Sequence, residues 1–108
     1  MSDGATSADS EDLVEQVLVI VERIPAGRVT TYGAIGAAVG RGPRWIGNVL
    51  ARNGGPVPWW RVVRADGSLP PSHQGEATER YDQEGTPSRA SGKVDMAAAF
   101  WSPQEASR

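Results

Sequence analysis

The first part of the chain carries apolar residues at helical spacing. They recur at intervals of four, three, one and three residues, at Leu13, Val17, Ile20, Val21 and Ile24. This spacing predicts a helix from about residue 11 to 24 with one buried face, ended by Pro25. Residues 1–10 are small, polar and acidic, so we expect a disordered acidic tail there, which is no targeting signal, and a single domain over residues 11–108.

Two further short helices are expected next. The first covers residues 32–39 with Thr31 as its N-cap, and the second covers about residues 44–52, with Pro43 suited to the first helical position. A turn with two glycines joins them. Two short helices joined by a tight glycine turn have the form of a helix-turn-helix, which is a DNA-binding motif.

The second of these helices has two contrasting faces. Ile46, Val49 and Leu50 form the stripe that we expect to be buried. The opposite stripe combines one charge, one amide and two nearly side-chain-free positions: Arg44, Asn48, Gly47 and Ala51. This stripe leaves room for a large surface to approach the helix backbone closely.

The rest of the chain mixes short elements. We expect a strand over residues 60–64 and a helix over residues 76–84, which Gly85 caps. Within that helix Glu76 and Arg80 stand four residues apart, which is a favourable spacing for an ion pair. The expected fold is mainly α with a short β element.

Charges are segregated along the chain. The formal net charge is −2, yet residues 1–22 hold six acidic residues and no base, and residues 23–65 hold seven arginines and no acid. The seven are Arg23, Arg28, Arg41, Arg44, Arg52, Arg61 and Arg64. Because a polyanion responds to the local potential within about 8–10 Å in physiological salt, this basic block favours nucleic-acid binding despite the acidic total.

The composition removes several kinds of chemistry. The chain has no cysteine and a single histidine, His73. This excludes disulfides, thiolate metal sites and cysteine nucleophiles, and it argues against a histidine metal site. We therefore expect no metal and no cofactor. Because no apolar run has the length of a membrane span, we expect a cytoplasmic protein without a membrane partner.

A recognisable motif follows the third expected helix. Residues 58–63, Pro-Trp-Trp-Arg-Val-Val, resemble the active-site motif Pro-Cys-His-Arg-Val of the O6-alkylguanine-DNA alkyltransferases. Supporting matches are Gly-Arg-Val-Thr-Thr-Tyr-Gly at 27–33, Arg-Trp-Ile-Gly at 44–47 and Ala-Asp-Gly-Ser at 65–68. The resemblance spans about residues 12–87, and it implies the winged helix-turn-helix-like fold of that family's C-terminal DNA-binding domain.

In that family, the motif cysteine removes the alkyl group from a flipped guanine in a single-use reaction. Trp59 stands at its position, which resembles the alkyltransferase-like branch, whose members bind O6-alkylguanine without repairing it. An indole is not a soft nucleophile of lowered pKa, but it can stack on a base. The resemblance therefore implies a monomeric, non-enzymatic sensor that binds double-stranded DNA and presents the lesion to nucleotide excision repair proteins.

The resemblance also assigns roles to single residues. Arg44 matches the finger that enters the base stack from the minor groove, and Tyr32 matches the residue that rotates the target phosphate. Asn53 and Glu84 match the outer members of a proton relay, in which Trp60 replaces the central histidine. The residues expected at the alkylguanine pocket are Trp59, Tyr32, Val63 and Ser72. Those expected to contact DNA are Arg44, Tyr32, Thr31, Gly47, Asn48, Arg52 and Arg64.

Other interpretations of these residues stay open. Trp59 and Trp60 point to opposite faces if they lie in a strand, so at most one of them lines a given pocket. Tyr32 is alternatively a core residue, and Trp45 either alters the minor-groove fit or extends the core. His73 is expected to face solvent, although residues 72–74 match the segment that closes over the base in the family. The remaining arginines of the motif region are phosphate contacts or solvated charges: Arg52, Arg61 and Arg64.

Three other functions compete with the lesion sensor. A sequence-specific helix-turn-helix regulator would read the major groove with the third helix, but Gly47 and Ala51 offer no side-chain donors for reading base edges. A protein-interaction module would use the ridge of Trp59 and Trp60 as a binding hot spot. Residual enzyme activity would show as transfer of the methyl group to the protein.

Overall fold

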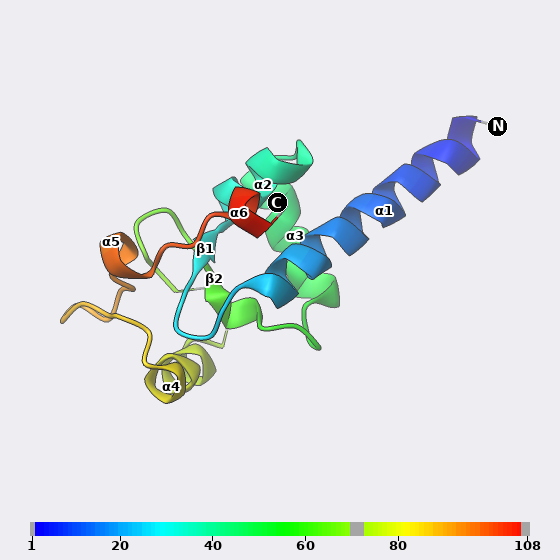
Figure 1. Ribbon diagram of the computed structural model, residues 1–108. Helices are drawn as coiled ribbons and strands as arrows, with labels where there is room; N and C mark the ends of the chain where they lie inside the picture. Colours follow the sequence, from blue (N-terminus) through cyan, green and yellow to red (C-terminus); the bar gives the residue numbers. More distant parts are fainter. Residues whose placement is uncertain (1, 70–72, 107–108) are drawn as a thin grey trace.

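Helices carry most of the secondary structure in the computed structural model, which describes residues 2–69 and 73–106. In chain order the elements are α1 (Ser2–Arg23), β1 (Thr30–Thr31), α2 (Tyr32–Val39), α3 (Pro43–Asn53), the 3-10 helix η1 (Trp59–Arg61), β2 (Val62–Val63), α4 (Gln74–Glu84), α5 (Met96–Ala99) and α6 (Pro103–Ala106). Helix α1 extends well beyond the other elements (Figure 1), so the molecule is 53 Å long and 29 by 21 Å across. No helix within the described residues combines the length and the apolar character needed to cross a bilayer.

Helix α1 carries the apolar face expected from its spacing. Val17 and Val21 are fully buried in the first core cluster, and Ile24 follows them directly after the helix. The start of the helix differs from the prediction, because α1 begins at Ser2 where a disordered tail was expected over residues 1–10. That segment contains no proline, which would interrupt a helix. Its separation from a domain over residues 11–108 stays a prediction.

Helices α2 and α3 form the predicted helix pair. The hydroxyl oxygen of Thr31 accepts a hydrogen bond from the backbone N–H of Ala34 at 2.9 Å, as expected of an N-cap. Gly40 ends α2 with a left-handed φ of 76°, and Pro43 begins α3. The buried stripe of α3 is the predicted one: Ile46, Val49 and Leu50.

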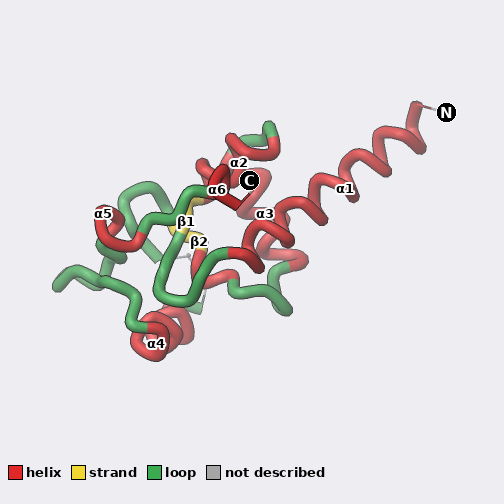
Figure 2. The backbone as a smooth tube through the Cα atoms, viewed as in Figure 1, coloured by secondary structure: helices red, strands yellow, loops and turns green. Residues whose placement is uncertain are grey.

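A short parallel pairing joins two distant parts of the chain. Thr30 pairs with Val62 and Thr31 with Val63, and Figure 2 shows these two strands as the small yellow segments among helices and loops. The strand predicted over residues 60–64 is thus only two residues long, because residues 59–61 form the 3-10 helix η1. A hydrogen bond from the backbone N–H of Val62 to the carbonyl of Trp59 closes this helix. The pairing fixes η1 beside the start of α2.

A second core cluster lies around helix α4 and the C-terminal segment. Its members are Val29, Val63, Ala77, Tyr81, Val94 and Ala99. Gly85 caps α4 in the left-handed conformation, and the predicted pair of Glu76 and Arg80 forms at 3.9 Å. The backbone N–H of Trp101 donates to the carbonyl of Val29 at 2.7 Å. The C-terminal segment therefore packs alongside the residue that precedes β1.

Gly36 in α2 is expected to resist substitution. A Cβ atom there would lie 2.3 Å from the backbone oxygen of Arg41 in the following turn. We expect Gly36→Ala to lower the free energy of unfolding by about 1–3 kcal/mol, measured by urea denaturation. Gly33→Ala in the same helix is the control, because its Cβ would come no closer than 4.0 Å to another group. Equal stability of the two variants would contradict the tight contact.

Candidate nucleic-acid interface

A cavity of about 710 Å³ lies between the start of α2, one face of α3, η1 and the start of α4. Ligand-binding pockets typically measure about 300–1,000 Å³, so this volume is suitable for a small molecule or a single base. Its lining among the described residues is Tyr32, Pro43, Arg44, Gly47, Asn48, Leu50, Ala51, Gly54, Gly55, Trp59, Arg64 and His73. The lining brings together several residues predicted from the sequence: Tyr32, Arg44, Gly47, Asn48, Trp59 and Arg64.

Three aromatic rings line this cavity from three separate parts of the chain: α2, η1 and the residue before α4. Trp59, in η1, is partly exposed, and its ring centroid lies 5.9 Å from that of His73. Tyr32 is half-buried; burial raises the pKa of its hydroxyl, and the nearby charge of Arg64 opposes that rise. The phenol therefore keeps its proton at neutral pH and can donate a hydrogen bond. Together the rings offer apolar surface on which a base can stack.

Helix α3 and the loop after it contribute a wall with few side chains. Gly47 and Ala51 line the cavity from α3, and Gly54 and Gly55 line it from the loop. An added Cβ at Gly47 or Gly55 would meet nothing within 4 Å. The cavity is therefore open beside these two glycines, where another molecule can approach the backbone, whereas an added Cβ at Gly54 would lie 2.4 Å from the backbone oxygen of Leu50.

Two arginines and an amide add polar groups to the cavity. Arg44 is exposed in the first turn of α3, where the helix dipole slightly disfavours a cation. Arg64 is exposed directly after β2, and Asn48 is exposed one turn beyond Arg44. Since guanidinium groups bind phosphate through two parallel hydrogen bonds, these positions suit an anionic backbone.

The other predicted site residues that the structure describes are not part of the lining of this cavity. Thr31 uses its hydroxyl oxygen to cap α2, and Arg52 is exposed near the end of α3 outside the lining. The prediction that Val63 lines the pocket is wrong, because both residues of β2 are buried and Val63 is 0% exposed in the second core cluster. Ser72 lies outside the described residues.

His73 lines the cavity, although it was not among the residues expected at the pocket. It is exposed, as predicted, and it adopts a left-handed φ of 60° at the residue before α4. This conformation, uncommon for a residue with a side chain, places the imidazole beside Trp59. The match of residues 72–74 to the family's closing segment is the sequence signal that points to His73.

Trp45 extends the core. Its ring is partly buried against the first core cluster, and the guanidinium carbon of Arg41 lies 5.4 Å from the ring centroid. These contacts favour a packing role for Trp45 over a change in minor-groove fit.

Arg61 forms an ion pair with Glu84 next to Trp60. The two side chains are only 16% and 13% exposed. Arg61 also donates to the backbone oxygen of Ile24 at 2.9 Å. Arg61 was predicted to be a phosphate contact or a solvated charge; the structure instead has each of its three nitrogens donate to Glu84 or Ile24.

The residues that match the family's proton relay form other contacts. The side-chain amide of Asn53 donates to the carbonyl of Val49 in its own helix at 3.2 Å. Glu84 accepts from the indole N–H of Trp60, also at 3.2 Å. Burial favours a raised pKa for Glu84, but the hydrogen bonds from Arg61 and Trp60 and the charge of Arg61 hold the pKa below its ordinary value of 4.5. Glu84 is thus a charged structural anchor.

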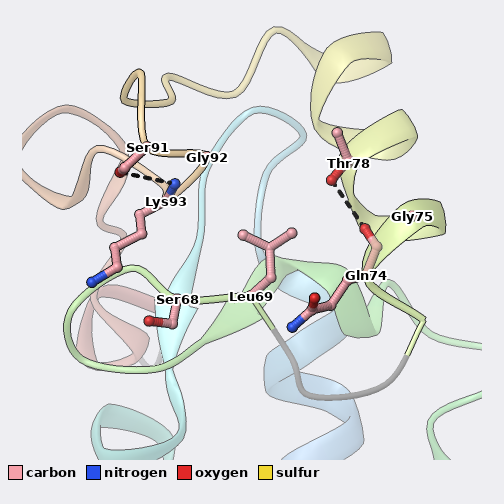
Figure 3. A pocket seen from close by; sticks show the side chains of 8 residues that line it. All are labelled: Ser68, Leu69, Gln74, Gly75, Thr78, Ser91, Gly92 and Lys93. Atoms are coloured by element: carbon pink, nitrogen blue, oxygen red, sulfur yellow. Dashed lines mark hydrogen bonds between the residues drawn. The ribbon is translucent and has the colours of Figure 1, made fainter.

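A second cavity, of about 340 Å³, lies between the loop after β2, the start of α4 and residues 91–93 (Figure 3). Two of its polar groups are engaged within the protein: the Thr78 hydroxyl donates to the carbonyl of Gln74 at 3.0 Å, and the Lys93 ammonium pairs with Asp66 at 3.1 Å. Within residues 2–69 and 73–106, no group of three or more His, Cys, Asp or Glu residues could hold a metal ion. The cavity beside Trp59 has about twice the volume and brings the predicted residues together, so it is the candidate site.

Residues 12–85 match the family model of the 6-O-methylguanine DNA methyltransferase, DNA binding domain. The DNA base-flipping protein of Escherichia coli (strain K12) is 37% identical over 95 residues, which cover 81% of this chain and 72% of that protein. The DNA base-flipping protein of Vibrio parahaemolyticus is 29% identical over 101 residues, which cover 86% of this chain and 99% of that protein.

Solved structures show the same fold. The crystal structure of S. pombe Atl1 in complex with damaged DNA containing O6-carboxymethylguanine matches with a TM-score of 0.74 and 26% identity, over 86% of this chain and 97% of that chain. A structure of S. pombe ATL in complex with DNA matches with a TM-score of 0.73 and the same identity. The predicted fold class, mainly α with a short β element and a helix-turn-helix-like DNA-binding domain, is confirmed.

Glu84 is expected to make the stability of the fold depend on pH. Its pKa is lower in the folded state, so its stabilisation is complete above the ordinary value of 4.5 and is lost as the pH falls through the folded-state pKa. We expect Glu84→Gln to lower the free energy of unfolding at pH 7 by about 1–3 kcal/mol, and the difference from the parent to shrink on acidification. Urea denaturation at a series of pH values measures both.

The matched control for that experiment is Glu79→Gln, an equivalent change at an exposed position of the same helix. This variant should follow the parent at every pH. A difference between Glu84→Gln and the parent that stays constant down to acid pH would show that the carboxylate charge is not what stabilises the fold.

Proposed function

The chain belongs to the family of the 6-O-methylguanine DNA methyltransferase DNA-binding domain, as an alkyltransferase-like protein, and we propose that it binds O6-alkylguanine in duplex DNA by flipping the base into the cavity beside Trp59. The observation that carries the proposal is a cavity of about 710 Å³ with a partly exposed indole in its lining. The DNA base-flipping proteins and Atl1 bound to damaged DNA support the same class of partner.

Binding is proposed to occur without alkyl transfer. Dealkylation requires a soft nucleophile with a depressed pKa, and the chain contains no cysteine. Trp59 occupies the motif position of that nucleophile, and neither its ring carbons nor its N–H can accept the alkyl group under the same conditions. The protein is therefore proposed to be a sensor and not an enzyme.

The stacking energy of Trp59 is sufficient for this role. An aromatic contact to a base contributes about 1–3 kcal/mol, and extruding a nucleotide whose pairing is already weakened costs a few kcal/mol. The two quantities are of similar size, so a lesion that weakens base pairing shifts the balance toward the flipped state. An intact guanine stays in the duplex under the same balance.

Arg44 and Tyr32 are proposed to act on the duplex. Both line the cavity that would receive the flipped base. Arg44 enters from the minor groove and fills the space of the extruded nucleotide, while the hydroxyl of Tyr32 donates to the target phosphate. Further contacts to the DNA come from Thr31, Gly47, Asn48, Arg52 and Arg64.

The bound complex is proposed to be presented to nucleotide excision repair proteins. A protein that holds a lesion and cannot remove it leaves the repair to another activity, and a bent duplex with an extruded base is a suitable signal for a pathway that reads distortion. The protein is proposed to act as a monomer, since one cavity suffices for one lesion. Its proposed location is the cytoplasm.

Trp59→Ala is expected to remove discrimination between damaged and intact DNA. Because the stacking contact is lost, the affinity for a duplex with O6-methylguanine should fall by roughly fivefold to a hundredfold. Affinity for the matched guanine duplex should change little. A fluorescence anisotropy titration with the two labelled duplexes measures both constants.

Trp45→Phe is the control for this titration, because Trp45 packs against the core outside the cavity lining. Equal affinity of the parent for the two duplexes would remove the sensor proposal while leaving DNA binding intact. Protein mass after incubation with the lesion is recorded in parallel, and an added methyl group would contradict the absence of transfer.

Arg44→Ala is expected to weaken binding to both duplexes. The variant loses a cation that contacts a phosphate or fills the base stack. If Arg44 neutralises a phosphate, the slope of log affinity against log salt concentration should fall by about 1. Arg41→Ala is the control, since Arg41 is exposed but lies over the ring of Trp45. Unchanged DNA affinity of Arg44→Ala would favour a protein-interaction module over a DNA-binding one.

A further inference from the structure

We propose that Trp60 is a positioning residue that sets the angle at which Trp59 meets a flipped base. The side chains that hold Trp60 are Glu84, Arg61 and Arg80. This inference deepens the function proposed above and rests on it. It starts from the difference between two neighbouring rings, because Trp59 is part of the described cavity lining and Trp60 is not.

One carboxylate fixes the edge of the Trp60 ring. The indole N–H donates to Oε1 of Glu84 at 3.2 Å, and Nε of Arg61 donates to the same oxygen at 3.0 Å. The backbone N–H of Gly27 reaches that oxygen at 3.5 Å, and the second carboxylate oxygen accepts from Arg61. Glu84 cannot rotate without breaking several charge-assisted bonds, so the ring edge is held with it.

Two cations and a backbone bond hold the rest of Trp60. The guanidinium carbons of Arg80 and Arg61 lie 4.7 Å and 5.5 Å from its ring centroid. Both distances are within the range of about 6 Å over which a cation attracts an aromatic face. The hydroxyl of Tyr81 donates to the backbone carbonyl of Trp60 at 2.5 Å. Helix α4 therefore fixes both the side chain and the backbone of this residue.

Because Trp60 is held in place, its ring contact with Trp59 restricts the orientation of the Trp59 ring as well. The two ring centroids are 5.7 Å apart and the planes are inclined by 86°, which is the edge-to-face arrangement that aromatic pairs favour. A ring that is already held in place loses less conformational freedom when a base stacks on it. Trp60 thus increases lesion affinity without touching the lesion.

Two variants test the inference, each with two readouts. Glu84→Gln keeps both indoles, so near-ultraviolet circular dichroism of the free protein reports their mutual orientation. Trp60→Phe keeps an aromatic ring and loses the bond to Glu84. For both variants we expect the ratio of dissociation constants for guanine and O6-methylguanine duplexes to fall by about threefold to tenfold, with unchanged affinity for the guanine duplex. Glu79→Gln should match the parent in both readouts.

The outcomes separate a positioning role from a merely structural one. The unfolding midpoint of each variant first establishes that it is folded. A folded variant overturns the inference if its ratio of dissociation constants equals that of the parent, or if it loses affinity for both duplexes equally. If the parent itself fails to distinguish the duplexes, the proposed function fails on its own account. The spectrum of Glu84→Gln then decides: a changed near-ultraviolet band supports the hold of Trp60 on Trp59, and an unchanged band overturns it.

Discussion

The candidate site depends on one short pairing, that of β1 with β2. Tyr32 follows β1 directly, while η1 precedes β2 and Arg64 follows it, so the register of two residue pairs sets the distance between these parts of the cavity. A shift by one residue would turn each side chain of the strand to the opposite face. Burial prevents such a shift, because Thr30, Val62 and Val63 are each 0% exposed. A pairing this short is therefore held in register by the two core clusters on which it lies.

Local patterns in the sequence were sufficient for the helices and for much of the cavity. The apolar spacing, Thr31 as a cap, and Pro43 and Gly85 at helix ends are all local signals, and each stands where the pattern placed it. Non-local contacts were not accessible in this way. Arg61 meets Glu84 across 23 positions in the chain, and the burial of Val63 follows from packing against α4. The strand expected over residues 60–64 was wrong in length, because a short 3-10 helix such as η1 has no distinctive periodicity in the sequence.

The basic block over residues 23–65 also has more than one role. Its charge pattern indicated a polyanion partner, and Arg44 and Arg64 do line the cavity. Other members are structural: Arg61 is paired with Glu84, and Arg28 donates to the carbonyls of Ala99 and Phe100 at 3.1 Å and 2.7 Å. Clustering of like charges in a sequence thus overstates the cationic surface available to DNA. Some of these arginines bind the protein's own carbonyls and carboxylates.

Most of the residues that α3 and its loop present to the cavity, Gly47 and Ala51 among them, carry no polar side-chain group; the exceptions are Arg44 and Asn48. Base pairs differ from one another mainly in the donors and acceptors along their edges, and glycine and alanine carry no side-chain group that could read them. What these apolar positions register is contour. A protein that recognises a nucleotide by contour is not tied to a consensus sequence, and it would meet one altered base in the same way in whatever genomic neighbourhood the base arises.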